Sequence, residues 1–392
     1  MLILVHLQLI ACSAHAADVI WSMKNAPYYI SEDNAQSVTA QAIDDARRHF
    51  TDPAHTDDNL TLLYPSGTYN FTGKPETNLQ AVLIANFQPG TTGKLIVKGE
   101  GFATTTLVIH NNQSERNGRS TSQAGFVVRR SSRIELRDFH LTVSHQTVSQ
   151  GTVRGVGVGY VDLEIHKGFP TPLQLESDRA NAPFGRYLRK YSYAFDPADP
   201  RIVQENNDQV RWASSQLAPN GTNSRLLLSK RAFVSGFAVG DLVAIKSRHG
   251  KDLYRFVDCS HITLDGIKFT RKTRGAFINC PYTTVTNIVI GREVIGGQTA
   301  CLASPEGGPQ FQSSVGGKPT GTRVIGLNVD GCTIVGTGDD CLGLFEQDGN
   351  VSGNIFQDSF ARGVYDFSPG PGLANLTAQN EFVRCMHLVE EN

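Results

Sequence analysis

The sequence predicts an all-β protein: a right-handed parallel β-helix with an N-terminal capping helix and an inserted antiparallel β-module. Short strands rich in Val, Ile and Thr recur, with Gly and Asn turns between them. The apolar residues that end four of these strands are 21, 44 and 22 residues apart: Phe269, Ile290, Ile334 and Phe356. This period of about 22 residues indicates a solenoid, since a sandwich spaces its strands at about 8–12 residues. A break in the period marks the inserted module.

Composition excludes some classes of function. Lys and Arg (36) nearly balance Asp and Glu (37), so the net charge of −1 gives no general attraction to nucleic acid or to anionic membranes. Residues 1–16 have the features of a secretory signal peptide, with an apolar stretch from Leu2 to Cys12 and an A-x-A cleavage pattern that ends at Ala16. The apolar stretch is too short to span a bilayer. We therefore expect export, to the periplasm or the medium.

Residues 17–147 are expected to form the N-terminal cap and the first coils. Apolar residues lie on one face of a helix over Ser37–Phe50. Leu60–Phe71 follows as a strand, a Pro-Ser-Gly turn and a second strand. A cap of this kind would cover the open core of the first coil. Short strands then recur at 94–98, 106–109, 125–128 and 133–136.

Residues 148–250 lack the period and are expected to form the inserted module. Gly157–Ile165, Arg225–Leu228 and Gly240–Lys246 have the pattern of antiparallel strands. We expect this module to lean over one face of the solenoid. Trp212 lies within it and is a candidate for stacking on a sugar ring or for the core of the module.

Residues 251–392 return to the period and hold the candidate active site. Matching strands are expected at 262–269, 283–290, 327–334 and 350–356, with a looser copy at 375–382. The interval of 44 residues predicts two coils, one of them degenerate or replaced by the Gly- and Pro-rich loop 304–320. The chain stops with no recognisable C-terminal cap, so we expect that it is a fragment.

Six cysteines remain once Cys12 leaves with the signal peptide. An even number in an exported protein is compatible with disulfides. The constant spacing of 21 residues between Cys259, Cys280 and Cys301 instead favours buried thiols stacked on successive coils. The sequence has no CxxC motif and no His/Cys cluster, and it predicts neither a metal nor a cofactor.

Two adjacent carboxylates, Asp339 and Asp340 (the Asp pair), lie within the repeated segment. Such a pair on one coil is a candidate for the acid and base of a glycan-cleaving enzyme. Consecutive residues of a straight strand face opposite sides, so both can serve one site only where the chain bends. Gly336 and Gly338 would permit that bend. The alternative interpretation of the dipeptide is a solvated turn.

The repeat gives the Asp pair neighbours on other coils. The equivalent positions hold Ala361 and Arg362 one coil later, and Arg274 and Gly275 in the coil that ends at Phe269. Adjacent coils lie about 4.8 Å apart, so Arg362 is expected beside Asp340. There it would hold Asp340 ionised as a general base, or bind a sugar hydroxyl or carboxylate. Asp339 could then keep a raised pKa and protonate the leaving oxygen.

The segment Gly336–Leu344, with the sequence GTGDDCLGL, resembles the Asp-Asp motif of the polygalacturonase-like family 28 glycoside hydrolases. The wider layout resembles the family 110 α-galactosidases more, with a β-helix, an inserted barrel and a Ser-Pro loop before the Asp-Asp coil. That loop would be Ser304–Phe311 here. The resemblance implies an inverting glycoside hydrolase that acts on galactose-containing glycan without a cofactor. Its catalytic residues would be Asp339 and Asp340, and its substrate-binding candidates are Arg362, Glu306, Gln310, Arg274 and Asp366.

The chain departs from family 28 one coil after the Asp pair, where Ala361-Arg362-Gly363 stands in place of Gly-His-Gly. A polygalacturonase-like pectin hydrolase is therefore the first alternative only. The second is a polysaccharide lyase, in which Lys272, Arg274 or Arg362 would act as the base opposite Ca²⁺-binding carboxylates. The third is a non-catalytic glycan-binding solenoid. Glu306, Glu346 and Asp366 could each supply a third carboxylate, whereas structural roles are expected for His145, His166, His249 and Asp358.

Overall fold

The computed structural model describes residues 17–71, 81–110, 125–144, 146–175, 190–195, 210–228, 237–247, 252–315, 320–368, 376–385 and 388–391. The expected signal segment 1–16, His145 and His249 lie outside these residues. So does the side chain of Trp212. None of the helices in the described part of the chain has the length and apolarity needed to cross a bilayer.

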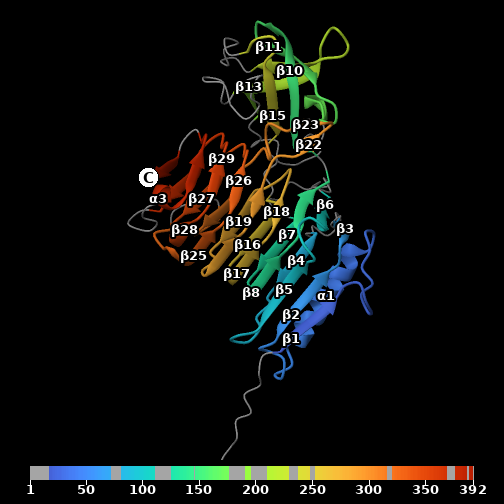
Figure 1. Cartoon of the computed structure of the whole chain (residues 1–392), viewed down its shortest axis with the longest axis vertical. Helices are drawn as coiled ribbons and strands as arrows, with labels where there is room; N and C mark the ends of the chain where they lie inside the picture. The colour runs from blue at the N-terminus through green and yellow to red at the C-terminus, as the bar shows by residue number, and fades with distance from the viewer. Residues whose placement is uncertain are drawn as a thin grey trace, which may run out of the picture.

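Three eight-stranded parallel sheets form a β-helix, and in each coil that has all three strands the chain passes from the first sheet to the second to the third (Figure 1). The first sheet contains β1 (Asp18–Ser22), β2 (Asn59–Tyr64), β5 (Lys94–Gly99), β8 (Ser132–Arg137), β17 (Ser260–Asp265), β20 (Thr283–Thr286), β25 (Val324–Asp330) and β28 (Gln347–Ser352). The second contains β3 (Gly67–Phe71), β6 (Thr105–Ile109), β9 (His140–Val143), β18 (Lys268–Phe269), β21 (Val289–Ile290), β26 (Thr333–Val335), β29 (Ile355–Gln357) and β31 (Glu381–Val383). The third contains β4 (Val82–Ala85), β7 (Phe126–Arg129), β16 (Tyr254–Val257), β19 (Gly275–Ile278), β24 (Pro309–Gln312), β27 (Leu342–Phe345), β30 (Val364–Phe367) and β32 (Val389–Glu391).

The core is a set of ladders of apolar side chains that run from coil to coil. Strand residues alternate between the inside and the outside, as the pattern of buried and half-buried residues in β2, β5 and β6 shows. In the third sheet, Phe256 stacks on Phe277 and Phe277 on Phe311, with ring centroids 4.8 and 4.6 Å apart. Identical aromatic residues at equivalent positions of successive coils therefore stack and hold the coils together.

The predicted register is confirmed for the later coils. Phe269 pairs with Ile290, and Ile334 pairs with Phe356. Phe382, in the looser copy, pairs with Phe356.

The interpretation of the 44-residue interval was wrong. Ile290 and Ile334 are direct partners, so the interval is one enlarged coil rather than two. The extra residues include the antiparallel hairpin β22 (Val294–Ile295) and β23 (Gln298–Thr299), and the coil keeps its own third-sheet strand, β24. A loop can lengthen a coil without changing the pairing of its strands, so the number of coils cannot be derived from the length of the interval alone.

The stacked thiols were predicted correctly for two of three cysteines. Cys259 and Cys280 are buried, and each follows a third-sheet strand at the same point of its coil. Cys301 instead follows β23 and packs outside the solenoid core, against the inserted module. All six cysteines of the described chain are free thiols.

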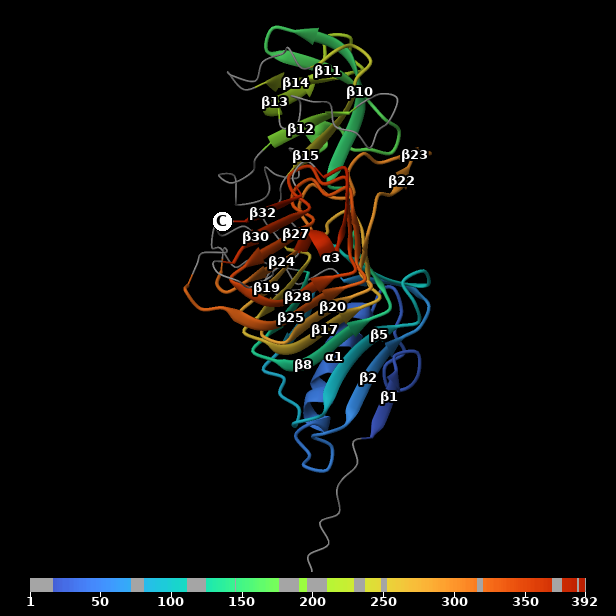
Figure 2. The same cartoon turned by 60° about the vertical axis from the view of Figure 1, so that its left-hand side comes forward.

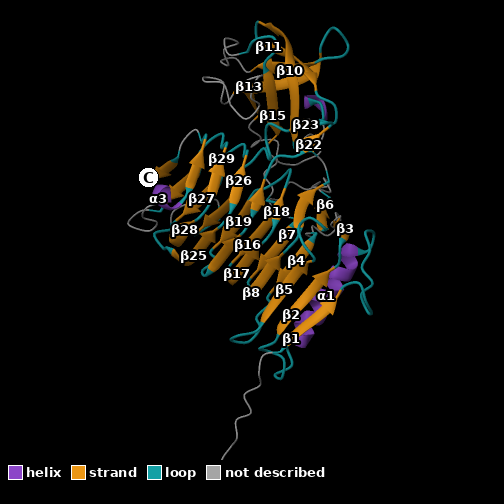
Figure 3. Ribbon diagram, viewed as in Figure 1, coloured by secondary structure: helices purple, strands orange, loops and turns teal. Residues whose placement is uncertain are grey.

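The helix α1 (Ala35–His49) packs its buried residues, among them Val38, Ala42, Ile43 and Ala46, into the same core as the first coils. It lies beside the first strands at the N-terminal end of the solenoid (Figure 3). A short helix, α3 (Leu376–Gln379), lies near the other end.

The segment between β9 and β16 forms a closed antiparallel barrel. Its strands are β10 (Val148–Gly157), β11 (Tyr160–Ile165), β12 (Lys190–Phe195), β13 (Val210–Leu217), β14 (Ser224–Leu228) and β15 (Leu242–Ser247). The barrel leaves the solenoid where the second sheet leads into the third, and it lies beside the β22–β23 hairpin (Figure 2). A small apolar cluster joins the two units, and in it Phe195 of the barrel packs edge-on against Phe360 of the solenoid at 5.3 Å.

One buried carboxylate, that of Glu346, anchors the loop that follows β24. It accepts hydrogen bonds from the backbone N–H groups of Thr320 and Gly321, both at 2.6 Å, and from the hydroxyl groups of Thr320 and Ser313. Burial raises the pKa of Glu346, but these hydrogen bonds outweigh it and lower the pKa from 4.5 to about 2. Glu346 is therefore a structural anchor rather than a third catalytic carboxylate.

This anchor predicts a pH effect. Because the folded pKa lies below the unfolded one, the stabilisation is complete above pH 4.5 and is lost as the pH falls toward about 2. We expect Glu346→Gln to lower the melting temperature at pH 7 and to flatten its fall between these pH values. Melting curves across this range test it, with Asp348→Asn, on an exposed residue, as control. Identical acid profiles for the wild type and Glu346→Gln would contradict it.

Candidate active site

The Asp pair lies on the middle one of three stacked turns, each of which leads from the second sheet into the third. The turns are 304–308, 337–341 and 359–363. Gly338 donates its N–H to the Ser304 carbonyl at 2.9 Å, and Gly308 donates to the Asp340 carbonyl at 3.0 Å. On the other side, Cys341 donates to the Arg362 carbonyl at 2.9 Å. The backbone thus fixes the pair between its neighbouring coils.

Asp340 and Arg362 form a bidentate ion pair, as the register predicts. Arg362 Nε lies 2.6 Å from Asp340 Oδ1, and its Nη2 lies 3.1 Å from Oδ2. Asp340 is only 6% exposed. The guanidinium group of Arg362 also lies over the ring of Tyr365, 3.9 Å from its centroid. Two hydrogen bonds from a permanently charged group favour the ionised form of the Asp340 carboxyl.

Asp339 stands next to Glu306 of the preceding coil. Ser304 bridges to Thr337, and two residues further along each turn Glu306 and Asp339 are opposite each other. Asp339 is half-buried, whereas Glu306 is only 1% exposed. Thr337 and Ser359 donate their hydroxyl groups to the Asp339 carbonyl at 2.8 and 3.1 Å. Three residues with carboxyl side chains therefore lie on two neighbouring turns of the solenoid.

Glycines allow the turn 304–308 to lie in close contact with the turn 337–341, which holds the Asp pair. A Cβ on Gly307 would lie 2.5 Å from the Asp340 carbonyl oxygen, and one on Gly308 would lie 2.1 Å from that of Cys341. The bend expected before the Asp pair is present, since Gly336 has a φ of +74°. Gly338 serves close packing rather than the bend, because a Cβ there would lie 2.9 Å from the carbonyl oxygens of Ser304 and Pro305.

We therefore expect Gly307→Ala to damage the site. The added methyl would meet a backbone oxygen that cannot rotate away, so the coils must separate, at a cost of roughly 1–3 kcal/mol. Thermal unfolding and turnover would both report the loss. Gly291→Ala is the matched control, because a Cβ at Gly291 would meet nothing within 4 Å. Equal stability and turnover in the two variants would contradict this account.

Gln310 lies on the outer face of the third sheet, one strand from the Asp pair. It pairs with Gly343, and a Cβ on Gly343 would lie 3.2 Å from its side chain and 3.3 Å from the Phe345 ring. Phe345 packs edge-on against Tyr365 at 5.4 Å. Half-buried aromatic rings and an amide thus adjoin the Asp340–Arg362 pair, and such groups can contact a sugar ring.

Two other predicted site residues lie elsewhere. Arg274 ion-pairs with Asp252, with Nε 3.1 Å from Oδ1. The strand register places Lys272 and Thr273, not Arg274 and Gly275, in line with the Asp pair, because this coil has a shorter turn. Asp366 pairs with the core residue Leu344, so it occupies an inward-facing position away from the outer surface.

Lys246 of the barrel is a further residue at this turn, and it was not among the site residues predicted from the sequence. This lysine is buried, and its Nζ donates a hydrogen bond to the Gly338 carbonyl, next to Asp339. The barrel therefore contributes a cation to the turn that holds the Asp pair. The residue is one of several lysines in an irregular insert, and no pattern in the sequence links residue 246 to residue 338.

The remaining candidates have structural contacts. His166 bonds Thr152 at 2.9 Å within the barrel. Asp358 is fully buried between Arg292 and Arg384. Both placements agree with the structural roles expected for these residues.

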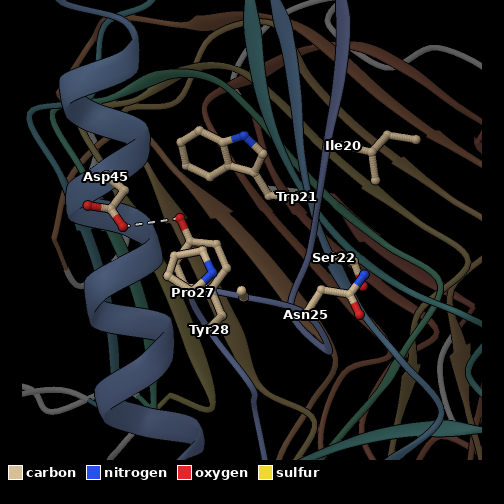
Figure 4. A pocket seen from close by; sticks show the side chains of 8 residues that line it. Ile20, Trp21, Ser22, Asn25, Pro27, Tyr28 and Asp45 are labelled. Atoms are coloured by element: carbon tan, nitrogen blue, oxygen red, sulfur yellow. Dashed lines mark hydrogen bonds between the residues drawn. The ribbon is translucent and has the colours of Figure 1, made fainter.

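A pocket of about 520 Å³ lies far from the Asp pair, between β1 and α1 (Figure 4). Trp21 and Tyr28 form part of its wall, and the Tyr28 hydroxyl donates to Asp45 at 3.1 Å. Asp45 is the one carboxylate among its lining residues. Because an inverting hydrolysis needs two carboxyls, this pocket does not fit that chemistry.

No family model matches the sequence, and no curated protein matches it. Among solved structures, a provisionally assigned glycosyl hydrolase from Parabacteroides merdae has 9% identity and a TM-score of 0.31, with 94% of this chain and 97% of that chain covered. The Yersinia enterocolitica family 28 exopolygalacturonase has 10% identity and a TM-score of 0.36, with 89% and 49% covered. Pectin methylesterase from Erwinia chrysanthemi has 7% identity and a TM-score of 0.33, with 96% and 81% covered. This chain thus spans about half the length of the exopolygalacturonase, and likeness at this level identifies neither a reaction nor a substrate for it.

Proposed function

We propose that this protein is an exported glycoside hydrolase that acts with inversion on galactose-containing glycan. The observation that carries the proposal is the Asp340–Arg362 ion pair, which sits between stacked coils next to a second, half-exposed carboxyl on Asp339. The motif resemblance around the Asp pair supports the reaction type. The galactose specificity and the export rest on the sequence alone.

In this mechanism Asp340 is the general base. Its ion pair with Arg362 keeps it charged, so it can accept a proton from a water molecule as that water attacks the anomeric carbon. Asp339 is the general acid, which protonates the leaving oxygen. Glu306 lies opposite Asp339 on the preceding coil and supplies a third carboxyl group in the same stack of turns.

The neighbouring groups would hold the sugar. Tyr365 and Phe345 present aromatic surface beside Asp340, and Gln310 presents an amide. A sugar ring has apolar C–H faces and polar edges, which suit this combination. The half-buried position of these side chains leaves them within reach of a ligand.

The test is a screen of aryl α- and β-galactosides and of galactose-containing polysaccharides with the purified protein. Proton NMR of the first product formed distinguishes inversion from retention. Hydrolysis with inversion supports the proposal. Retention of configuration would reject the mechanism, and glycan binding without turnover across the panel would favour a non-catalytic solenoid. An unsaturated, ultraviolet-absorbing product that requires Ca²⁺ would identify a lyase instead.

A further inference from the structure

A second group of chemically active side chains lies at the N-terminal end of the solenoid, on coils distant from the Asp pair. His49, His55 and Asp58 each present one possible ligand atom, and these three atoms lie within 4.8 Å of one another. Asp58 Oδ2 is 3.0 Å from His49 Nε2 and 2.8 Å from His55 Nδ1. Two imidazole nitrogens therefore face a single carboxylate oxygen.

Local structure fixes two of the three groups. His49 is the last residue of α1, and its ring meets the rings of Trp21 and Phe50 edge-on at 5.6 and 5.3 Å. The Asp58 side chain is 5% exposed, and its other oxygen, Oδ1, accepts the Ala17 N–H at 3.1 Å. This second contact turns Oδ2 toward the histidines, as outer contacts do for metal-binding carboxylates.

We propose that His49, His55 and Asp58 bind a divalent transition-metal ion of the Zn²⁺ type. The ligands would be His49 Nε2, His55 Nδ1 and Asp58 Oδ2. Two neutral imidazoles and one carboxylate are a donor set that suits Zn²⁺, and a fourth position remains for water. The proposal is independent of the proposed hydrolysis. It also departs from the expectation of no metal, which rested on the absence of Cys-containing patterns.

The distances come close to those of a tetrahedral site. Metal–ligand bonds of about 2.0–2.1 Å place tetrahedral ligand atoms about 3.3 Å apart. The two measured contacts to Asp58 are 2.8 and 3.0 Å, so the ligands must spread by a few tenths of an ångström. In the metal-free state both rings donate a hydrogen to Asp58. A metal ion would take the place of these two hydrogens, and each neutral ring would then carry its proton on the other nitrogen, Nδ1 of His49 and Nε2 of His55.

One ring must turn for the ion to enter. The rings of His49 and His55 stack with centroids 4.4 Å apart and planes inclined by 25°. The lone pairs of their ring nitrogens are therefore nearly parallel and do not point to one common position. His55 lies on the turn before β2, and its side chain is 45% exposed. It therefore has the freedom to rotate until its Nδ1 points to the ion that His49 and Asp58 hold.

The bound ion would strengthen the N-terminal end of the solenoid. It would join the end of α1 to the start of β2 and, through Asp58 and the Ala17 N–H, to the segment that precedes β1. The first coil of a solenoid has a neighbour on one side only, so its covering elements need added contacts. We expect the metal to raise stability and to leave turnover at the Asp pair unchanged.

The experiment uses the full chain without a histidine tag, stripped of metal with a chelator. Zn²⁺ is titrated against a chromophoric chelator, and Co²⁺ is added separately to record its d–d absorption. We expect one Zn²⁺ per chain, a tetrahedral Co²⁺ spectrum, and a rise in melting temperature of about 3 °C at a hundredfold excess over the dissociation constant. His55→Ala should weaken Zn²⁺ binding by at least about 100-fold and abolish both other signals.

The control is His261→Asn, which removes an exposed histidine that packs on Tyr282 outside the cluster and keeps a residue type that tolerates the φ of +54° at this position. It should bind Zn²⁺ as the wild type does. His49→Gln removes a different ligand and should also weaken Zn²⁺ binding, so it replaces His55→Ala if that variant folds poorly. Circular dichroism tests whether each variant is folded. Equal Zn²⁺ binding by His55→Ala and the wild type, or no binding at micromolar Zn²⁺, would overturn the proposal. A loss of hydrolysis at the Asp pair would leave this result unaffected, so the two proposals fail separately.

Discussion

Asp340→Asn is expected to reduce hydrolysis by at least about 10³-fold while the protein stays folded. The amide has nearly the same shape as the carboxylate but cannot accept the proton of the attacking water, and general base catalysis contributes about 10²–10⁴ in rate. Asn can still accept one hydrogen bond from Arg362, so the stacked turns should remain in place. Turnover of the best substrate from the glycoside screen, together with the melting temperature, measures both effects.

The companion variant Asp339→Asn should show a loss that depends on the leaving group. Substrates with good aryl leaving groups need little protonation, so they should retain more activity in Asp339→Asn than in Asp340→Asn. Asp348→Asn, on an exposed residue of β28, serves as the control for removal of one charge. Wild-type turnover in Asp340→Asn would remove the Asp pair from the mechanism.

Asp358→Ala is expected to destabilise the fold by about 3–5 kcal/mol, because it leaves a buried cation without its partner. The Asp358 side chain is 0% exposed and lies 2.8 Å from Arg292 Nη1 and 2.6 Å from Arg384 Nε. The Arg292 side chain is itself only 7% exposed. Asp358 also has a φ of +53°, a conformation that Asp and Asn tolerate better than Ala does.

This ion-pair network also supports the candidate active site. Arg292 donates its Nε to the Cys301 carbonyl at 2.8 Å, and it fills the space where a Cβ of Gly336 would lie. Urea unfolding measures the effect of Asp358→Ala on the free energy of unfolding. Asp358→Asn should lower this free energy less, because Asn tolerates the backbone conformation and keeps one hydrogen bond. Asp348→Ala should change stability by less than about 0.5 kcal/mol. A loss in Asp358→Ala no larger than this control would contradict the structural role.

Much of the solenoid could be predicted from the sequence, because each coil repeats the same pattern of short strands, inward-facing apolar residues and turns. The position of Arg362 beside Asp340 followed from the phase of Ile334 and Phe356 alone. Between these two coils the turns have equal length. The same reasoning failed for Arg274, since the turn after Phe269 is shorter than the turn after Ile334 and the strand register shifts with it.

The period, the alternation of inward and outward residues and the place of the Asp pair on its coil can all be derived from the amino-acid sequence. These depend on contacts between adjacent coils, which repeat along the chain. Three features became visible in the folded chain alone: the interval from Ile290 to Ile334 is one coil, Lys246 reaches Gly338, and His49, His55 and Asp58 converge. These three features depend on loops and on an insert, whose paths follow from packing against distant parts of the chain rather than from a local pattern.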